Sequence, residues 1–189
     1  MNPPRVRAFV ALELPEQVRG ELARVIDITA GLPGKLALVP PEKLHLTLAF
    51  LGPSEPERLE RLGDALRVIA RAHSGFELEL GGPGVFPAPT RPSVLWIGLR
   101  QSPALHGLQA AVDAACRAHG WILEDRAFQA HLTCARVKFA GPSGALASAW
   151  QRIEVTPVRW RADSLSLMRS DSGPGGARYT AIARLPLPM

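Results

Sequence analysis

Two short segments of the chain repeat a pattern of residues that could carry acid–base chemistry. The tripeptide His-Leu-Thr occurs at His45–Thr47 and again at His131–Thr133. Side chains of an extended strand alternate between its two faces, so each segment would present one imidazole and one hydroxyl on the same face. Because histidine titrates near neutral pH, one imidazole can accept a proton while the other donates one. The repeat therefore predicts a proton acceptor on one side of a reacting atom and a proton donor on the other.

A phosphorus atom is the reaction centre that suits two imidazoles on opposite sides. In an in-line displacement, one imidazole would take a proton from the attacking water and the other would give a proton to the leaving oxygen. The hydroxyl groups of Thr47 and Thr133 could hold the non-bridging phosphate oxygens. A single His-x-Thr would more often be structural, and the repetition favours a catalytic interpretation. The remaining histidines lie on or beside predicted helices and are interpreted as structural or surface residues; they are His73, His106 and His119.

Strand-like and helix-like patterns alternate around the first motif. Strands are predicted at 7–14, 44–51 and 76–80. A helix is expected after Pro15, and its apolar residues recur at helical spacing. They are Val18, Leu22, Val25, Ile26 and Thr29. A second helix is predicted to have Ser54 as its N-cap and Glu57 at N3, in the form of a capping box. Its apolar stripe consists of Leu59, Leu62, Leu66 and Ile69.

The second half of the chain repeats this order. A glycine- and proline-rich break is expected at 81–89, and an exposed hairpin loop at 170–176. Ser102 is predicted to cap a helix that begins at Pro103, and a short helix is expected at 143–152. The apolar stripe of the longer helix is Leu105, Leu108, Val112 and Cys116. Strands are predicted at 94–99, 128–137, 153–158, 164–169 and 178–185.

Both halves therefore read strand, helix, strand, helix, strand. This internal repetition predicts one α+β domain over residues 1–189, built from two pseudo-symmetric lobes that correspond to about 1–85 and 86–189. The lobes are expected to face a central cleft, where ligands tend to bind. If an approximate two-fold axis relates the lobes, the two His-Thr pairs converge across that cleft.

The composition excludes several classes of protein. Hydrophobic residues make up 47% of the chain and charged residues 21%, which excludes collagen-like, coiled-coil and fully disordered chains. No apolar run approaches the roughly 18 residues of a membrane span and no signal peptide is recognised, so we expect a cytoplasmic protein without membrane association. The net charge of +5 favours an anionic partner. Cys116 and Cys134 lack metal-ligand spacing and are expected to be buried free thiols.

At its two motifs the sequence resembles the two-histidine phosphoesterase superfamily, and within it the bacterial and archaeal RNA 2′,3′-cyclic phosphodiesterases, historically called 2′-5′ RNA ligases. The segments that carry the likeness are 7–15, 45–48, 91–98, 131–136, 165–170 and 176–179. The resemblance implies antiparallel sheets with helices on their outer faces. It also implies hydrolysis of an RNA-terminal 2′,3′-cyclic phosphate to a 2′-phosphate. The expected partner is RNA with such an end, including tRNA fragments, or a small cyclic nucleotide, and the expected state is a monomer.

The resemblance also implies roles for the motif residues. His45 matches the histidine that protonates the leaving 3′ oxygen, and His131 matches the one that activates water. Thr47 and Thr133 match positions that hold the phosphate. The residues alone do not distinguish the acid from the base, so this assignment depends on the family.

Four further residues are candidates for substrate binding. Arg136 matches a family arginine near the phosphate or the base, but strict alternation would place it on the opposite face from His131, so it contributes only if the strand twists or ends there. Phe9 is a candidate for base stacking, although alternation leaves open whether it faces the core. Arg91 and Tyr179 are weaker candidates.

Neither a metal nor a cofactor is expected. The motifs contain no carboxylate, and threonines are poor zinc ligands. No Gly-x-x-x-x-Gly-Lys-Ser/Thr phosphate loop is present. Three alternatives stay open: the same site could ligate RNA ends or act on another cyclic or 2′-5′-linked nucleotide, the chain could be a non-catalytic RNA-binding module, or it could be a metal-dependent hydrolase.

Overall fold

The computed structural model describes residues 5–141, 144–174 and 176–189. The elements in chain order are β1 (Val6–Glu13), α1 (Glu16–Thr29), β2 (Lys35–Leu38), the 3₁₀ turn η1 (Pro41–Lys43), β3 (His45–Ser54), α2 (Pro56–Ala72), β4 (Phe76–Ala88), β5 (Arg91–Leu99), α3 (Pro103–Ala118), β6 (His131–Phe139), α4 (Ala145–Gln151), β7 (Arg159–Ala162), β8 (Ser164–Gly173) and β9 (Gly176–Pro186).

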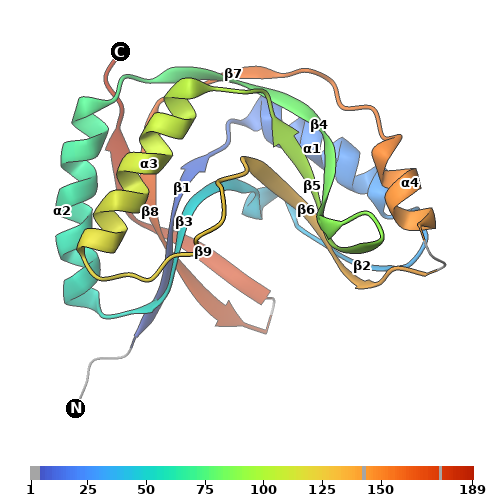
Figure 1. Ribbon diagram of the computed structural model, residues 1–189, viewed down its shortest axis with the longest axis horizontal. Helices are drawn as coiled ribbons and strands as arrows, with labels where there is room; N and C mark the ends of the chain where they lie inside the picture. Colours follow the sequence, from blue (N-terminus) through green and yellow to red (C-terminus); the bar gives the residue numbers. More distant parts are fainter. Residues whose placement is uncertain (1–4, 142–143, 175) are drawn as a thin grey trace.

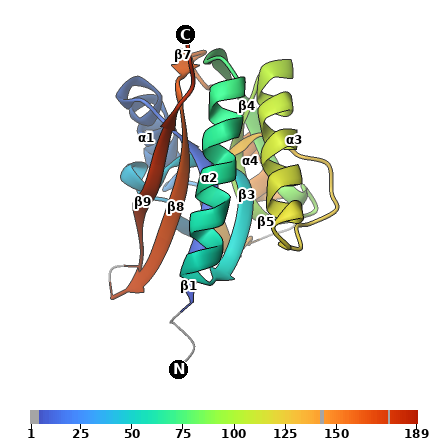
Figure 2. The same ribbon diagram turned by 90° about the vertical axis from the view of Figure 1, so that its left-hand side faces the viewer.

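The strands form two antiparallel sheets, one ordered β3-β1-β8-β9 and the other β2-β6-β5-β4-β7. Helices α2 and α3 pack side by side against the first sheet, and α1 and α4 pack against the second (Figures 1 and 2). The prediction of an α+β fold with two antiparallel sheets and flanking helices is confirmed. None of the helices in the described residues is long and apolar enough to cross a membrane.

The two sheets do not follow the two halves of the sequence. Strands β2 and β4 come from the first half but lie in the sheet of β5 and β6, and β8 and β9 return from the second half to pair with β1. The helices cross over in the same way, because α1 packs against β6 and α3 against β3. Each half of the chain therefore contributes strands to both sheets, and a continuous core forms between sheets and helices.

Apolar periodicity predicted the main helices well. The five predicted residues of α1 are all buried, and so are the four predicted residues of α3. The Ser102 side chain accepts a hydrogen bond from the Leu105 backbone amide, which confirms it as the N-cap of α3. Cys116 and Cys134 are buried free thiols as predicted, and burial raises the pKa of each to about 12.

Ser54 is not a helix cap. It is the last residue of β3 and is almost fully buried, and its hydroxyl donates to the Gly52 carbonyl and accepts a hydrogen bond from Trp121 Nε1 at 3.1 Å. Glu55 occupies the N-cap position of α2 without a side-chain cap. The predicted capping box is therefore wrong, because the hydroxyl serves tertiary packing.

Three further element predictions differ from the structure. Residues 81–88 of the predicted break at 81–89 belong to strand β4. Residues 153–158, which were predicted as a strand, do not form one. The short strand β2 was not predicted. The hairpin loop predicted at 170–176 is shorter, because β8 continues to Gly173 and β9 begins at Gly176. Helix α4 was expected within 143–152; residues 143 and 175 lie outside the described residues.

Candidate active site

The two motif histidines begin equivalent strands of the two sheets. His45 is the first residue of β3 and His131 is the first residue of β6. These strands contact each other where the sheets meet (Figure 1). The pKa of His45 lies below its ordinary value, mainly because the imidazole is buried. The charge of His131 lowers this pKa further, and the hydrogen bond to the Lys43 carbonyl partly opposes the shift. The two imidazoles are thus close enough for the charge on one to affect the other.

Both imidazoles are anchored by the same kind of hydrogen bond. Nδ1 of His45 donates to the Lys43 carbonyl at 2.8 Å, and Nδ1 of His131 donates to the Gln129 carbonyl at 2.7 Å. Since a carbonyl oxygen can only accept, Nδ1 carries a hydrogen in each ring. Nε2 is therefore the nitrogen of each imidazole that can exchange a proton with another molecule.

Matching β-bulges follow the two motifs. In β3, Leu48 is the extra residue, since Thr47 and Ala49 pair with consecutive residues of β1. In β6, Cys134 is the extra residue, since Thr133 and Ala135 pair with consecutive residues of β5. A bulge shifts the alternation of side chains by one position. Arg136 consequently lies on the face of His131, which meets the condition that the sequence left open.

The first bulge has a consequence that sequence reasoning missed. Phe50 occupies the position in β3 that Arg136 occupies in β6, and 66% of Phe50 is exposed. Its ring lies 6.3 Å from the ring of Phe9. The signal was present in the sequence, because aligning the two His-Leu-Thr segments pairs Phe50 with Arg136.

Aromatic rings frame the first histidine. Phe9 stacks on His45 with ring centroids 4.6 Å apart, and Tyr179 meets His45 edge-on at 5.1 Å. Phe9 itself is only 3% exposed and packs with Met168. This burial disfavours the predicted stacking of Phe9 on a base, because the ring already covers the histidine. Tyr179, in contrast, is half-buried beside the site.

Aromatic rings also frame the second histidine. Phe86 from β4 contacts His131 edge-on at 4.9 Å, and the Trp96 ring from β5 lies 6.0 Å away. Neither residue was singled out from the sequence, because nothing in the order of the residues shows that β4 reaches across β5 to His131. Each sheet thus holds its histidine against two aromatic side chains.

Two arginines distinguish the surroundings of His131. Burial is the largest cause that lowers the pKa of His131; the bond to the Gln129 carbonyl opposes it, and the charges of Arg126 and Arg136 lower the pKa further. Arg126, which sequence reasoning missed, lies in the segment between α3 and β6, and its guanidinium carbon is 5.8 Å from the Phe86 ring centroid. These positive charges favour the neutral form of His131.

Arg91 is not brought to the histidines. On β5, Gly98 pairs with His131, whereas Arg91 begins the strand at the end next to Ala88. A separation of seven residues along an extended strand corresponds to roughly 23 Å. Arg91 is exposed, and its backbone lies about that far from the position on β5 that pairs with His131.

The described part of the chain contains no group of three or more His, Cys, Asp or Glu side chains that could hold a metal ion. The chemically capable groups of the site are two imidazoles, two threonine hydroxyls and the arginines next to His131. This arrangement can supply one proton acceptor, one proton donor and several hydrogen-bond donors for an anion.

Solved structures with this fold include one that is named a phosphoesterase, with a TM-score of 0.77 and 26% identity over 99% of this chain and 100% of that one. The chain is similar to Escherichia coli LigT complexed with 3′-AMP, with a TM-score of 0.77 and 26% identity, over 99% of this chain and 100% of that one. It is also similar to TT0787 of Thermus thermophilus, with a TM-score of 0.78 and 29% identity, over 96% and 97% of the two chains. Fold and site therefore define a phosphoesterase of the LigT type.

Sequence comparison identifies the family. The model of the 2′-5′ RNA ligase superfamily matches residues 9–174, and the chain belongs to that superfamily. A protein of Methanothermobacter thermautotrophicus named RNA 2′,3′-cyclic phosphodiesterase is 34% identical over 181 residues, which cover 93% of this chain and 96% of the relative. A Thermus thermophilus protein of the same name is 33% identical over 198 residues, with 96% and 90% covered.

Proposed function

We propose that the protein hydrolyses the 2′,3′-cyclic phosphate at the end of an RNA to a 2′-phosphate, with His131 as proton acceptor and His45 as proton donor. The observation that carries this proposal is the pair of imidazoles, each anchored through Nδ1, at the start of two contacting strands that belong to different sheets, with the charge of His131 lowering the pKa of His45. The names of the relatives support the choice of substrate.

The reaction begins with water on the His131 side of phosphorus. Neutral Nε2 of His131 takes a proton from the water as its oxygen bonds to phosphorus, and the bond from phosphorus to the 3′ oxygen breaks on the opposite side. The Nε2 proton of His45 transfers to that oxygen and completes a 3′ hydroxyl. The products are a 2′-phosphate, neutral His45 and protonated His131, and proton exchange with solvent restores the starting state.

Electrostatics support this division of roles. Only His131 has arginines among the causes that lower its pKa, so the neutral form needed in a base is favoured there. His45 faces no such cation except His131 itself. When His131 is neutral, its charge no longer lowers the pKa of His45, so His45 can more readily hold the proton that a general acid needs. An acid whose pKa is lowered by burial also gives up its proton more readily.

The remaining residues of the site bind the substrate. Thr47 and Thr133 donate hydrogen bonds to the non-bridging oxygens, and Arg136 balances their charge. Phe50 offers an exposed aromatic face on which a base can stack, a role that the buried Phe9 does not suit. Tyr179 orients His45 through its edge contact.

The test is turnover of an RNA oligonucleotide that ends in a 2′,3′-cyclic phosphate, with identification of the product isomer. The wild-type protein should release only the 2′-phosphate, and His45→Ala or His131→Ala should each lower kcat by about 10²–10⁴-fold, the usual contribution of a general acid or base. His73→Ala, at the C-cap of α2, is the matched control. A 3′-phosphate product or unchanged turnover in either variant would contradict the proposal.

A further inference from the structure

Beyond its histidine, the second sheet carries charge of one sign. Strands β2, β5 and β6 contain four cationic residues and no aspartate or glutamate. The four are exposed, and they are Lys35, Arg91, Arg136 and Lys138. In the part of the chain that the structure describes, none of their side chains forms an ion pair. Because no carboxylate pairs with these cations, this part of the sheet attracts anions.

The register of β2 against β6 places an exposed aromatic ring on the face of the active site. Val137 pairs with Leu36, and both side chains pack against the core. The next pair is Phe139 with Lys35, which alternation directs to the opposite face, the face of Arg136. Phe139 is 61% exposed there. A cation and an aromatic ring therefore lie opposite each other on two paired strands.

Arg91 lies at the same end of the second sheet. Strand β5 runs antiparallel to β6, and Val94 pairs with Arg136. Arg91 is three residues before Val94. Phe139 is three residues after Arg136, so Arg91 and Phe139 lie beyond this pair in the same direction. Figure 1 shows β2, β6 and β5 side by side, with this end directed away from α2 and α3. We call the surface formed by Lys35, Arg91 and Phe139 the distal surface.

The distal surface is too far from the histidines to touch the cyclic phosphate. His131 and Phe139 are eight residues apart on β6, and two of the residues between them are bulge residues. The remaining six steps along the strand correspond to roughly 20 Å. Arg136 lies between the two on the same face. A nucleic acid whose end is bound at the histidines therefore reaches the distal surface only with nucleotides upstream of that end.

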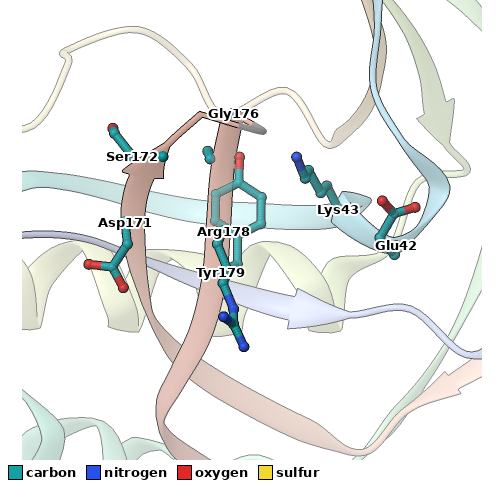
Figure 3. Close-up of a pocket in the computed structure, with 9 residues that line it drawn as sticks. Glu42, Lys43, Asp171, Ser172, Gly176, Arg178 and Tyr179 are labelled. Carbon is teal, nitrogen blue, oxygen red and sulfur yellow. The ribbon is translucent and has the colours of Figure 1, made fainter.

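The other charged surface next to the site is less suited to a phosphodiester backbone. The cavity of 420 Å³ at the β8–β9 hairpin is lined by carboxylates as well as cations, which are Glu42, Asp171, Lys43 and Arg178. Arg178 alternates with Tyr179 on β9, and its guanidinium is directed away from Lys43 (Figure 3). That cavity therefore offers an anion no convergent pair of cations, whereas the strands of the distal surface carry cations without carboxylates.

We propose that the distal surface binds single-stranded RNA upstream of the cyclic end, with a base stacked on Phe139 and backbone phosphates contacted by Lys35 and Arg91. The position of the RNA end in this proposal rests on the proposed function. An aromatic ring stacks on any unpaired base, and cations beside it hold the backbone. The combination of exposed cations and an exposed ring is typical of surfaces that bind single strands. Between the histidines and the distal surface the RNA passes Arg136.

The first experiment compares adenosine 2′,3′-cyclic phosphate with an adenosine hexanucleotide that ends in the same cyclic phosphate. In the wild-type protein we expect kcat/KM to be about tenfold or more higher for the hexanucleotide, mostly through a lower KM. Phe139→Ala should lower kcat/KM for the hexanucleotide by about fivefold or more and leave that for the mononucleotide within about twofold. Val68→Ala is the matched control, because Val68 is 68% exposed on α2, and it should change neither value.

The second experiment measures binding of a hexanucleotide that ends in a 2′-phosphate, by fluorescence anisotropy at increasing salt concentration. For a single strand, each phosphate neutralised by the protein contributes about 0.7 to the slope of log K against log salt. Lys35→Gln and Arg91→Gln should therefore each make this slope shallower by about 0.7. Arg61→Gln, which changes an exposed arginine on α2, is the matched control and should leave the slope unchanged.

Three results would overturn the inference while the proposed function stands. They are equal kcat/KM for the two substrates in the wild type, an equal loss for both in Phe139→Ala, and an unchanged salt slope in either Lys35→Gln or Arg91→Gln. Tighter binding of the hexanucleotide after it is annealed to a complementary strand would also overturn it, because a duplex offers no unpaired base to Phe139. A wild-type protein that hydrolyses neither substrate would overturn the proposed function, and the salt slopes would still decide whether the distal surface binds RNA.

Discussion

Each histidine of the proposed mechanism is held by one backbone carbonyl and two aromatic rings. Nδ1 is occupied in both, and the ring of His45 is stacked on Phe9 while that of His131 is met edge-on by Phe86. The sequence predicted the two His-Thr pairs from strand alternation alone. It did not predict their aromatic partners, because contacts between distant strands leave no local pattern.

Burial of both imidazoles predicts an acidic optimum for the reaction. The pKa values of His45 and His131 are each lowered mainly by burial from the ordinary 6.5. The base must be neutral and the acid protonated, so activity falls below the lower pKa and above the higher one. The profile of kcat/KM against pH should be a bell with its maximum below pH 6.5. A maximum above pH 7.5 would contradict the burial of the two rings.

Arg126, one of the two arginines whose charge lowers the pKa of His131, provides a second test of the same electrostatics. Arg126→Gln removes a positive charge that lowers the pKa of His131, so the pKa should rise. Titration of the histidine side chains by ¹⁵N NMR measures this directly. Arg126 is not among the causes that shift the pKa of His45, so His45 is the internal control. No rise at His131, or an equal rise at both histidines, would exclude the proposed influence of Arg126.

Phe50 and Phe9 should respond differently to truncation. Phe50→Ala should lower kcat/KM by about tenfold or more and leave the melting temperature nearly unchanged, because an exposed stacking ring is worth about 1–3 kcal/mol per base. Phe9→Ala should destabilise the protein by about 3 kcal/mol, since it removes a buried ring. Thermal melts and kinetics on the cyclic-ended RNA measure both. The reverse pattern would restore Phe9 as the stacking residue.

At the scale of elements, the paired bulges after Thr47 and Thr133 complete the site. They place the side chains of Phe50 and Arg136 on the same face as the histidines, whereas strict alternation would have placed them on the opposite face. Helical periodicity predicted the buried residues of α1 and α3 because the period is set by the element itself. A bulge adds one residue without a signature in the composition. From the sequence we could therefore predict only that Arg136 contributes if the strand departs from strict alternation.

The capping residues give an element-scale prediction. Ser102→Ala removes the side-chain acceptor for the Leu105 amide at the start of α3 and should lower the free energy of unfolding by about 1 kcal/mol, with unchanged kcat. Glu57→Gln is the control, because the capping box it would have completed does not form. Urea denaturation measures both changes. A larger loss in Glu57→Gln than in Ser102→Ala would contradict these assignments.

At the scale of the whole molecule, the two sheets exchange elements across the sequence repeat. Strands β2 and β4 join the sheet of β6, and β8 and β9 complete the sheet of β3. The repeat of element types predicted two sheets with flanking helices. It could not assign each strand to its sheet, because the pattern of a strand records its burial and not its partners.

The acid–base mechanism needs no metal-bound water, since both proton transfers are assigned to imidazoles. Hydrolysis of the cyclic-ended RNA should therefore keep its full rate after dialysis against EDTA. The assay is repeated with added zinc and manganese. Loss of activity in the chelator and its recovery with either metal would favour a metal-dependent hydrolase instead.

The central claim is that His45 and His131 act on the same phosphorus atom. ¹⁵N NMR of the histidine side chains during titration with adenosine 2′-phosphate tests it most directly. We expect the Nε2 signals of both residues to shift together and to saturate at one equivalent, while the Nδ1 signals move little. A shift confined to one histidine, or saturation at two equivalents, would contradict it.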